Sequence, residues 1–195
     1  RSGEWSRSAD FSFWKTPMTE LAGRTIGIFG FGRIGRRVGE IAVALRMHVI
    51  ASRSARSAAP DWPGFRWCEN LDELLRESDM VTLHCPLLPS TRGFINAASI
   101  EKMKRSAFLI NVARGPLIVE QDLADALNSG RIAGAALDVL SSEPPASDNP
   151  LLSAKNCIVT PHIAWATMEA RKRLLDTVIE NLRAFLVGAP VNVVS

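Results

Sequence analysis

The stretch TIGIFGFGRIGRRVGEIAVAL, residues 25 to 45, decides the fold. It begins with a short apolar run ending in glycine, which predicts a buried strand over 25–30. Apolar residues at helical spacing follow, and they predict a helix over 33–45. Gly30, Gly32 and Gly35 stand at the junction. A strand, a glycine-rich turn and a helix in this order indicate the first unit of a parallel sheet.

Strand-like and helix-like segments alternate along the rest of the chain. The pattern predicts strands over 47–51, 80–85, 107–112, 133–139 and 156–161, and helices over 70–78, 99–104, 120–130 and 166–188. The connections are short, and the Pro- and Ser-rich stretch 141–150 is expected to be a surface loop. This alternation predicts an α/β fold, a doubly wound parallel sheet with helices on both faces, of the Rossmann type.

Composition and charge narrow the function. The 195 residues are 47% hydrophobic and 22% charged, which is typical of one globular domain. The net charge of +3 is spread along the chain, so we expect no nucleic-acid partner. Apolar runs are too short to cross a membrane, which takes about 18 residues. Cys68, Cys85 and Cys157 lack metal-type spacing, so we expect no metal site, reduced thiols and a cytoplasmic location.

The glycine motif predicts a site for a dinucleotide pyrophosphate. Gly30 would allow the tight turn, Gly32 the approach of the phosphates, and Gly35 the close packing of helix on strand. The backbone amides of Arg33 and Ile34 would point at the phosphates from the positive end of the helix. A turn with only a packing role is the alternative, and its place between strand and helix argues against that.

The residues after the second predicted strand bear on the choice between NAD and NADP. An acidic residue about 20 positions after the glycine motif normally holds the ribose hydroxyls of NAD. Here Ser52, Arg53 and Ser54 take that place. A guanidinium pairs with a 2′-phosphate and serine hydroxyls can donate to it, so we expect NADP to be preferred. The alternative is a solvated basic loop, with NAD bound through the remaining contacts.

Arg114, Asp138, Glu143 and His162 each stand at or shortly after the end of a predicted strand. The carboxyl ends of parallel strands line one crevice, so these side chains can converge although they are distant in sequence. Their types suit the reduction of a 2-oxo acid: arginine clamps the carboxylate, histidine supplies a proton, and a carboxylate orients the histidine. Taken singly, each has a structural explanation as a surface charge or a strand-end cap.

Five segments together resemble the D-isomer-specific 2-hydroxyacid dehydrogenase family, and the match runs from about Gly3 to the end of the chain. They are GFGRIG (30–35), LHCPLLPSTRGFIN (83–96), FLINVARGPLIVEQDLADAL (108–127), GAALDVLSSEP (134–144) and TPHIAWAT (160–167). The resemblance implies an NAD(P)-dependent enzyme that acts on small 2-oxo or 2-hydroxy acids. GEWSRSADFSFW (3–14) and Trp165 are most similar to glycerate dehydrogenases, also called hydroxypyruvate reductases.

The resemblance also implies roles for individual residues. Arg114, Glu143 and His162 correspond to the catalytic set, with His162 as acid and base, and Asp138 corresponds to the aspartate that binds the nicotinamide carboxamide. The other positions expected to contact the cofactor are Arg33 and Ile34 at the pyrophosphate, Cys85, Pro86 and Thr91 beside the adenosine half, and Val112, Ala113, His162 and Ala164. Family members often carry an acid where Arg53 stands, which again favours NADP over NAD.

The resemblance divides the chain into three parts. Residues 1–22 correspond to the end of an inter-domain helix and a connecting segment, 23–188 to the NAD(P)-binding domain with a C-terminal helix over 166–187, and 189–195 to a tail. Family members have a further N-terminal substrate domain, and we expect this chain to be the part that follows it, either as a fragment or as a short natural member. Hydride transfer needs a cleft closed to water, so we expect cofactor binding with weak or no turnover from this chain by itself.

Partners and alternatives follow from the same resemblance. We expect a small acid as substrate, no membrane partner, and a homodimer; an unpacked apolar face on 166–187 would also favour association. A cofactor-sensing corepressor module and a phosphite dehydrogenase remain open as other functions. Glu143 argues against a formate dehydrogenase, because those enzymes carry glutamine beside the histidine.

Overall fold

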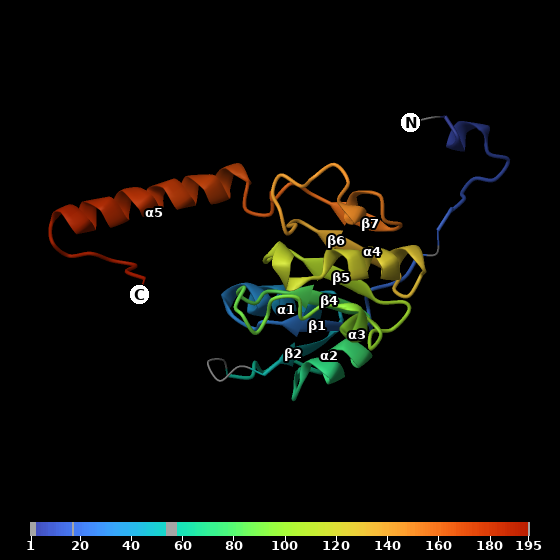
Figure 1. Ribbon diagram of the computed structural model, residues 1–195, viewed down its shortest axis with the longest axis horizontal. Coiled ribbons are helices and arrows are strands. Elements are labelled where there is room, and N and C mark those ends of the chain that lie inside the picture. The colour runs from blue at the N-terminus through green and yellow to red at the C-terminus, as the bar shows by residue number, and fades with distance from the viewer. Residues whose placement is uncertain (1–2, 17, 54–57, 195) are drawn as a thin grey trace.

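A computed structural model describes residues 3–16, 18–53 and 58–194 (Figure 1). The described residues form a seven-stranded sheet with the order β3-β2-β1-β4-β5-β6-β7, and every neighbouring pair is parallel. The strands are β1 (Thr25–Phe29), β2 (His48–Ser52), β3 (Arg66–Cys68), β4 (Met80–Leu83), β5 (Phe108–Asn111), β6 (Gly134–Leu137) and β7 (Cys157–Val159). The doubly wound α/β prediction is confirmed. The order reverses between β1 and β4, where such sheets bind their ligands.

The helices cover the sheet and connect its strands. They are α1 (Arg33–Ala44), α2 (Leu71–Glu77), α3 (Ala97–Ile100), α4 (Glu120–Asn128) and α5 (Met168–Leu186), with 3-10 turns η1 (Trp5–Arg7), η2 (Gly115–Leu117) and η3 (Pro150–Leu152). The stretch 141–150 is a loop that runs into η3, as predicted. β3 was missed, because three residues are too few for a recognisable alternation of apolar and polar side chains.

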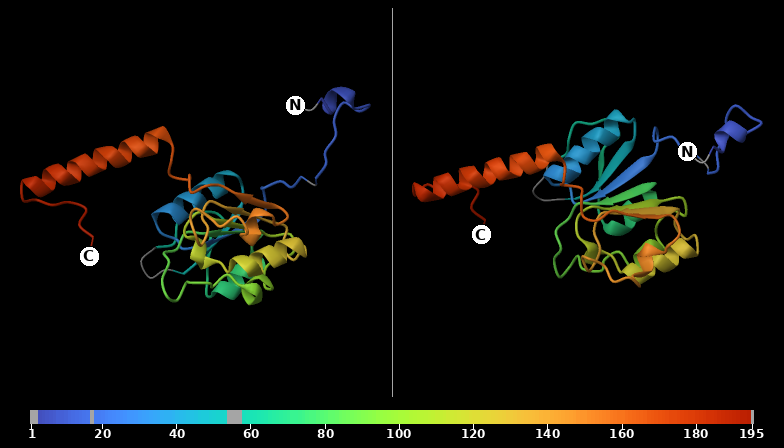
Figure 2. Two further views of the ribbon diagram at one scale, coloured as in Figure 1. Left: turned by 45° about the horizontal axis from the view of Figure 1, so that its top comes forward. Right: turned by 90° about the horizontal axis from the view of Figure 1, so that it is seen from above.

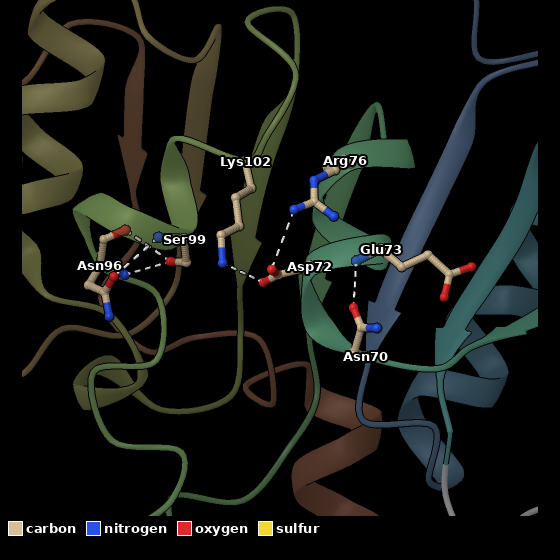
Figure 3. A network of polar contacts seen from close by, with 7 residues as sticks. All are labelled: Asn70, Asp72, Glu73, Arg76, Asn96, Ser99 and Lys102. Carbon is tan, nitrogen blue, oxygen red and sulfur yellow. Dashed lines mark hydrogen bonds and ion pairs between the residues drawn. The ribbon is translucent and has the colours of Figure 1, made fainter.

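The predicted helix over 99–104 is wrong, and the caps show why. Asn96 and Ser99 form a capping box, each side chain accepting a hydrogen bond from the other's backbone amide, so α3 begins at Ala97 and ends at Ile100 (Figure 3). Lys102, beyond the helix end, reaches back to Asp72 of α2 at 2.6 Å. Asn70 caps α2 in the same way by accepting a hydrogen bond from the Glu73 amide.

Helices lie on both faces of the sheet, but their cover is unequal (Figure 2). α2, α3 and α4 pack on one face over a continuous apolar core. On the other face, α1 covers β1 and β2. Beside it, Phe108 of β5 is 45% exposed and Ile158 of β7 is 66% exposed. Parallel sheets are normally buried on both sides. Within the described residues, half of this face is therefore bare.

Both ends of the chain stand away from the sheet (Figures 1 and 2). α5 projects from the body on one side, and no residue of this helix, which is described over its whole length, is buried. The N-terminal segment extends on the opposite side and exposes Trp5, Phe11 and Trp14. None of the helices in the described part of the chain is both long and apolar enough to span a membrane.

Candidate active site

The glycine turn between β1 and α1 is shaped by close backbone contacts. Gly30 has φ +98°, and a Cβ there would lie 2.6 Å from the backbone of His84 and Cys85. A Cβ on Gly35 would lie 2.2 Å from the Gly30 carbonyl oxygen. On Gly32, by contrast, a Cβ would meet nothing within 4 Å. Gly30 and Gly35 thus close the turn, and Gly32 leaves an open surface above it.

The N-terminus of α1 is suited to an anion. Gly32 is its N-cap, none of the described side chains caps it, and its first turn carries no acidic residue. Arg33 and Ile34 are exposed there. Uncapped amides at the positive end of a helix attract a negative group, and the open surface at Gly32 gives that group room. The residues present therefore fit a dinucleotide pyrophosphate.

A cavity of about 540 Å³ continues from the glycine turn toward β2 and β3. Its wall includes residues expected to contact the cofactor: Gly30, Gly32, Ser52, Arg53, Cys85 and Pro86. The Ser52 hydroxyl accepts a hydrogen bond from the Gly30 amide at 3.0 Å, so Ser52 also holds the turn. Arg53 is exposed. Ser54, the other predicted contact, lies outside the described residues.

Cys85 and Thr91 shape the loop beyond β4. Cys85 is buried, and its burial raises the pKa of the thiol to about 11, so it remains neutral at physiological pH. The Thr91 hydroxyl donates to the Pro86 carbonyl at 2.8 Å and accepts from the Leu88 amide at 2.8 Å. Thr91 therefore fixes the loop that places Cys85 and Pro86 in the cavity wall.

Glu143 and His162 lie together at the carboxyl edge of the sheet. His162 Nδ1 is 2.7 Å from Glu143 Oε2, and Glu143 Oε1 accepts a hydrogen bond from the Leu140 amide at 3.0 Å. The hydrogen bond with His162 is the main cause that holds the pKa of Glu143 below its usual range. An ionised Glu143 accepts the proton of Nδ1, which leaves Nε2 as the nitrogen that can exchange a proton with a substrate.

Asp138, directly after β6, holds the loop that carries His162. Its buried carboxylate accepts hydrogen bonds from the Thr160 hydroxyl at 2.5 Å and from the amides of Ile163 and Ala164 at 2.9 and 2.8 Å. Burial opposes ionisation of Asp138, but these hydrogen bonds outweigh it and hold its pKa below the usual value. The loop can therefore keep His162 at φ +53°, a left-handed conformation uncommon outside glycine.

The structure does not bring the Arg114 side chain to this pair. Arg114 is exposed, and its guanidinium donates to the carbonyl of Ala113 at 2.6 Å. Its backbone is nevertheless fixed by the buried Asn111, whose side-chain amide donates to the Arg114 carbonyl at 2.8 Å. Among the described residues, no hydrogen bond or ion pair joins the Arg114 side chain to Glu143 or His162, so its place in the catalytic set stays a prediction. Val112, exposed, and Ala113, half-buried, occupy the same turn.

A second cavity, of about 380 Å³, borders the Glu143–His162 pair. Its wall is mostly apolar and is formed by residues that include Leu140, Pro144, Leu152, Val159 and Pro161. Asp138 and Thr160 add polar groups at its edge. Electrostatic interactions are stronger beside such an apolar surface than in open water.

Comparison with known protein families decides the assignment. Residues 1–164 match the family model described as D-isomer specific 2-hydroxyacid dehydrogenase, NAD binding domain. The chain belongs to the D-isomer-specific 2-hydroxyacid dehydrogenase family. It is 54% identical over 193 residues to a hydroxypyruvate reductase of Blautia hydrogenotrophica, and the match covers 99% of this chain and 60% of that protein.

Solved structures of dehydrogenases and reductases share the fold. An acyclic imino acid reductase, Bsp5, in complex with NADPH and D-Arg superposes with a TM-score of 0.86 at 34% identity, over 100% of this chain and 61% of that one. A D-isomer specific 2-hydroxyacid dehydrogenase from Lactobacillus delbrueckii ssp. bulgaricus, in its NAD complex, gives a TM-score of 0.81 at 31% identity, over 97% and 63%. The chain thus spans about three fifths of the length of these relatives.

Several residues that organise this site were missed from the sequence. Thr160 and Asn111 are polar residues at strand ends, and both could have been noted from TPHIAWAT and NVARG. Phe31, inside the glycine motif, is buried in an aromatic cluster with Trp62, Phe65 and Trp67, at centroid distances of 5.3–5.8 Å. Trp62, Phe65 and Trp67 stand within one short stretch, but no local pattern in the sequence pairs that stretch with Phe31.

Proposed function

We propose that this chain carries the cofactor site and the acid–base pair of an NAD(P)-dependent reductase of 2-oxo acids, of the hydroxypyruvate reductase or glycerate dehydrogenase type. The observation that carries the proposal is the 2.7 Å contact between His162 and an ionised Glu143, at the edge of a sheet whose first turn fits a pyrophosphate. The identity with a hydroxypyruvate reductase supports the choice of substrate class.

The proposed roles of the polar residues follow from their contacts. The bound nicotinamide would supply the hydride. His162 would give the proton on Nε2 to the ketone oxygen, and Glu143 would hold the ring and stabilise the charged imidazolium. Arg114 would leave the Ala113 carbonyl to pair with the substrate carboxylate, which is a rotation of an exposed side chain. The same residues serve the reverse oxidation, with His162 as the base.

Asp138 retains capacity for the cofactor as well as for the loop. An ionised carboxylate has about four acceptor positions. Thr160, Ile163 and Ala164 occupy three of them. One position would therefore be open to a donor from the nicotinamide carboxamide, with Val112, Ala113 and Ala164 beside it.

We propose NADP as the preferred cofactor, with its adenosine half in the cavity beside the glycine turn. Arg53 is exposed at its wall, where a guanidinium can pair with a 2′-phosphate. Ser52 uses its oxygen as acceptor for the Gly30 amide, so its hydroxyl proton is free to be donated to a phosphate oxygen. Glu69 also lines the cavity and opposes a dianion. The NADPH complex of the imino acid reductase supports the proposal, and the NAD complex of the Lactobacillus enzyme keeps NAD as the alternative.

A panel of substrates tests this function. We expect NADPH-dependent reduction of hydroxypyruvate or glyoxylate, and its loss by about a hundredfold or more in His162→Gln, because no other group would supply the proton. His48→Gln is the matched control, since His48 is exposed at the start of β2. Turnover by this chain alone is expected to be slow, since the His162 and Glu143 side chains are 44% and 37% exposed to water.

Phosphite and formate belong in the same panel. Oxidation of phosphite with no reduction of any 2-oxo acid would move the proposal to the other substrate class. Capture of transcription factors by the cofactor-bound protein would favour a cofactor-sensing module over an enzyme, because weak or no turnover is expected of this chain by itself.

We also propose that the protein is a cytoplasmic homodimer. Cys68 and Cys85 are buried and Cys157 is half-buried, and free thiols of this kind support a reducing compartment. The exposed apolar residues of the N-terminal segment and the bare face over β5 and β7 are surfaces that a second copy could cover. The mass in solution, measured by light scattering after size exclusion, tests the dimer.

A further inference from the structure

The loop between β6 and η3 carries Glu143 and has little support of its own. Its residues from Ser141 to Pro144 are exposed. A side chain on such a loop holds one position only if other elements fix the loop backbone. The groups that do so therefore control how Glu143 meets His162.

Glu120, the first residue of α4, contacts both ends of this loop. Its Oε1 accepts a hydrogen bond from the Ser141 amide at 2.6 Å. Its Oε2 accepts from the side-chain amide of Asn149 at 2.8 Å. Asn149 in turn accepts from the Leu151 amide at 3.0 Å, which caps η3. One carboxylate thus ties the start and the end of the loop to a helix that packs in the core.

The peptide bond between Leu140 and Ser141, whose amide donates to Glu120, also contacts the turn after β5 that carries Arg114 (the arginine turn). A Cβ on Gly115 would lie 2.0–2.5 Å from the backbone atoms of Leu140 and Ser141, so this peptide packs directly on the residue after Arg114. The neighbouring amide, that of Leu140, is the one that donates to Glu143 at 3.0 Å. The backbone of 140–141 therefore links the arginine turn, Glu120 and Glu143.

We propose that Glu120 is a positioning residue for the acid–base pair. By accepting hydrogen bonds from the Ser141 amide and Asn149, it fixes the loop so that Glu143 contacts His162. The same contacts hold the loop against the turn that carries Arg114. The catalytic role of this contact rests on the proposed function. The positioning of Glu143 by Glu120 can be tested independently, because the contact between Glu143 and His162 can be measured without turnover.

Glu120→Ala tests the proposal through the titration of Glu143. The Glu143 carboxyl is followed by carbon NMR in the 195-residue chain and assigned by comparison with Glu143→Gln. If the loop shifts, Glu143 loses its hydrogen bonds with His162 and the Leu140 amide, and its pKa rises toward the usual value. Removing the Glu120 charge without moving the loop would have the opposite sign, because losing a nearby negative charge lowers a carboxyl pKa.

Asp122→Ala is the matched control. Asp122 lies in the same first turn of α4 and also accepts a backbone hydrogen bond, but from Ala97 at the start of α3, at 2.7 Å. The Asp122→Ala substitution removes the same charge and a comparable hydrogen bond, and it should leave the pKa of Glu143 unchanged. Glu120→Gln, which keeps an oxygen for the Ser141 amide, should give an intermediate shift and serves if the alanine variant does not fold.

Turnover gives the second readout. Where a 2-oxo acid is reduced, Glu120→Ala should lower kcat about tenfold or more and leave the KM for the cofactor unchanged. An unshifted Glu143 in both Glu120 variants, or an equal shift in Asp122→Ala, would overturn the proposal. Absence of turnover in the wild type would bear on the proposed function alone, and the NMR result would still decide the role of Glu120.

Discussion

At the scale of single residues, the site depends on backbone atoms as much as on side chains. Gly30 and Gly35 are required by contacts with other backbone atoms, whereas Gly32 borders open space. These roles were assigned from the motif alone, since the sequence pattern fixes the turn geometry. The direction of the Arg114 side chain was not predictable, because it depends on its contact with the Ala113 carbonyl.

Two alanine substitutions separate binding from stability. Gly32→Ala should leave the free energy of unfolding within about 0.5 kcal/mol of wild type, since its methyl group meets nothing. It should still weaken cofactor binding at least about tenfold, because the methyl group occupies the place of the pyrophosphate. Gly35→Ala should lower the free energy of unfolding by about 1–3 kcal/mol, because its Cβ would meet the Gly30 carbonyl.

Urea unfolding and fluorescence titration with NADPH measure the two effects. Full cofactor affinity in Gly32→Ala would contradict the assignment of the pyrophosphate to this turn. Wild-type stability in Gly35→Ala would mean that the turn relaxes more easily than the contacts indicate.

At the scale of elements, the succession of strands and helices along the chain was predicted well from the sequence, and the residues at which they begin and end less well. The long patterns of α1, α4 and α5 are strong signals, because several turns repeat the same spacing. α3 was misplaced because its start depends on the capping box of Asn96 and Ser99, which competes with the apolar pattern downstream. The loop after β7 is likewise fixed by a residue distant in sequence, Asp138, which directly follows β6.

Asp138→Asn should destabilise the domain in a pH-dependent way. At pH 7 we expect the free energy of unfolding to fall by about 1–3 kcal/mol, because the amide cannot accept all three hydrogen bonds. The folded-state pKa of Asp138 is lowered, so its contribution is present above the ordinary value of about 3.9 and is lost as the pH falls through the lowered one. The difference between variant and wild type should therefore shrink at acidic pH.

Urea unfolding at pH 7, 5 and 3.5 follows this difference. Asp148→Asn is the control, since Asp148 is exposed in the neighbouring loop. A difference that does not change with pH would mean that the Asp138 charge plays no part in holding the loop.

At the scale of the whole molecule, the cover of the sheet is incomplete. Helices on both faces were predicted, and one half of one face is bare in the described residues. The alternation of strands and helices specifies which faces need cover but not which segment provides it. α5 was predicted from its spacing, yet its apolar side is exposed, with Leu182 57% and Phe185 68% accessible. The pattern of a helix does not show where it packs.

The exposed side of α5 should make this chain associate in solution. We expect sedimentation velocity to show a mass that rises with concentration, because exposed apolar area is lost on association. Leu182→Glu with Phe185→Glu should lower that mass. Arg173→Glu, at an exposed polar position of α5, changes the net charge by the same amount and is the control for added charge. A monomer at every concentration would contradict this expectation.

The central proposal is that the glycine turn, together with Ser52 and Arg53 at the end of β2, forms a dinucleotide site that prefers the cofactor with a 2′-phosphate, NADP. Fluorescence titration of the purified chain with NADPH and with NADH tests it most directly. We predict binding of NADPH at least about tenfold tighter, from charge-assisted hydrogen bonds to Arg53, and loss of that preference in Arg53→Asp. Equal or tighter binding of NADH, unchanged by Arg53→Asp, would contradict the NADP preference, and binding of neither nucleotide would contradict the site itself.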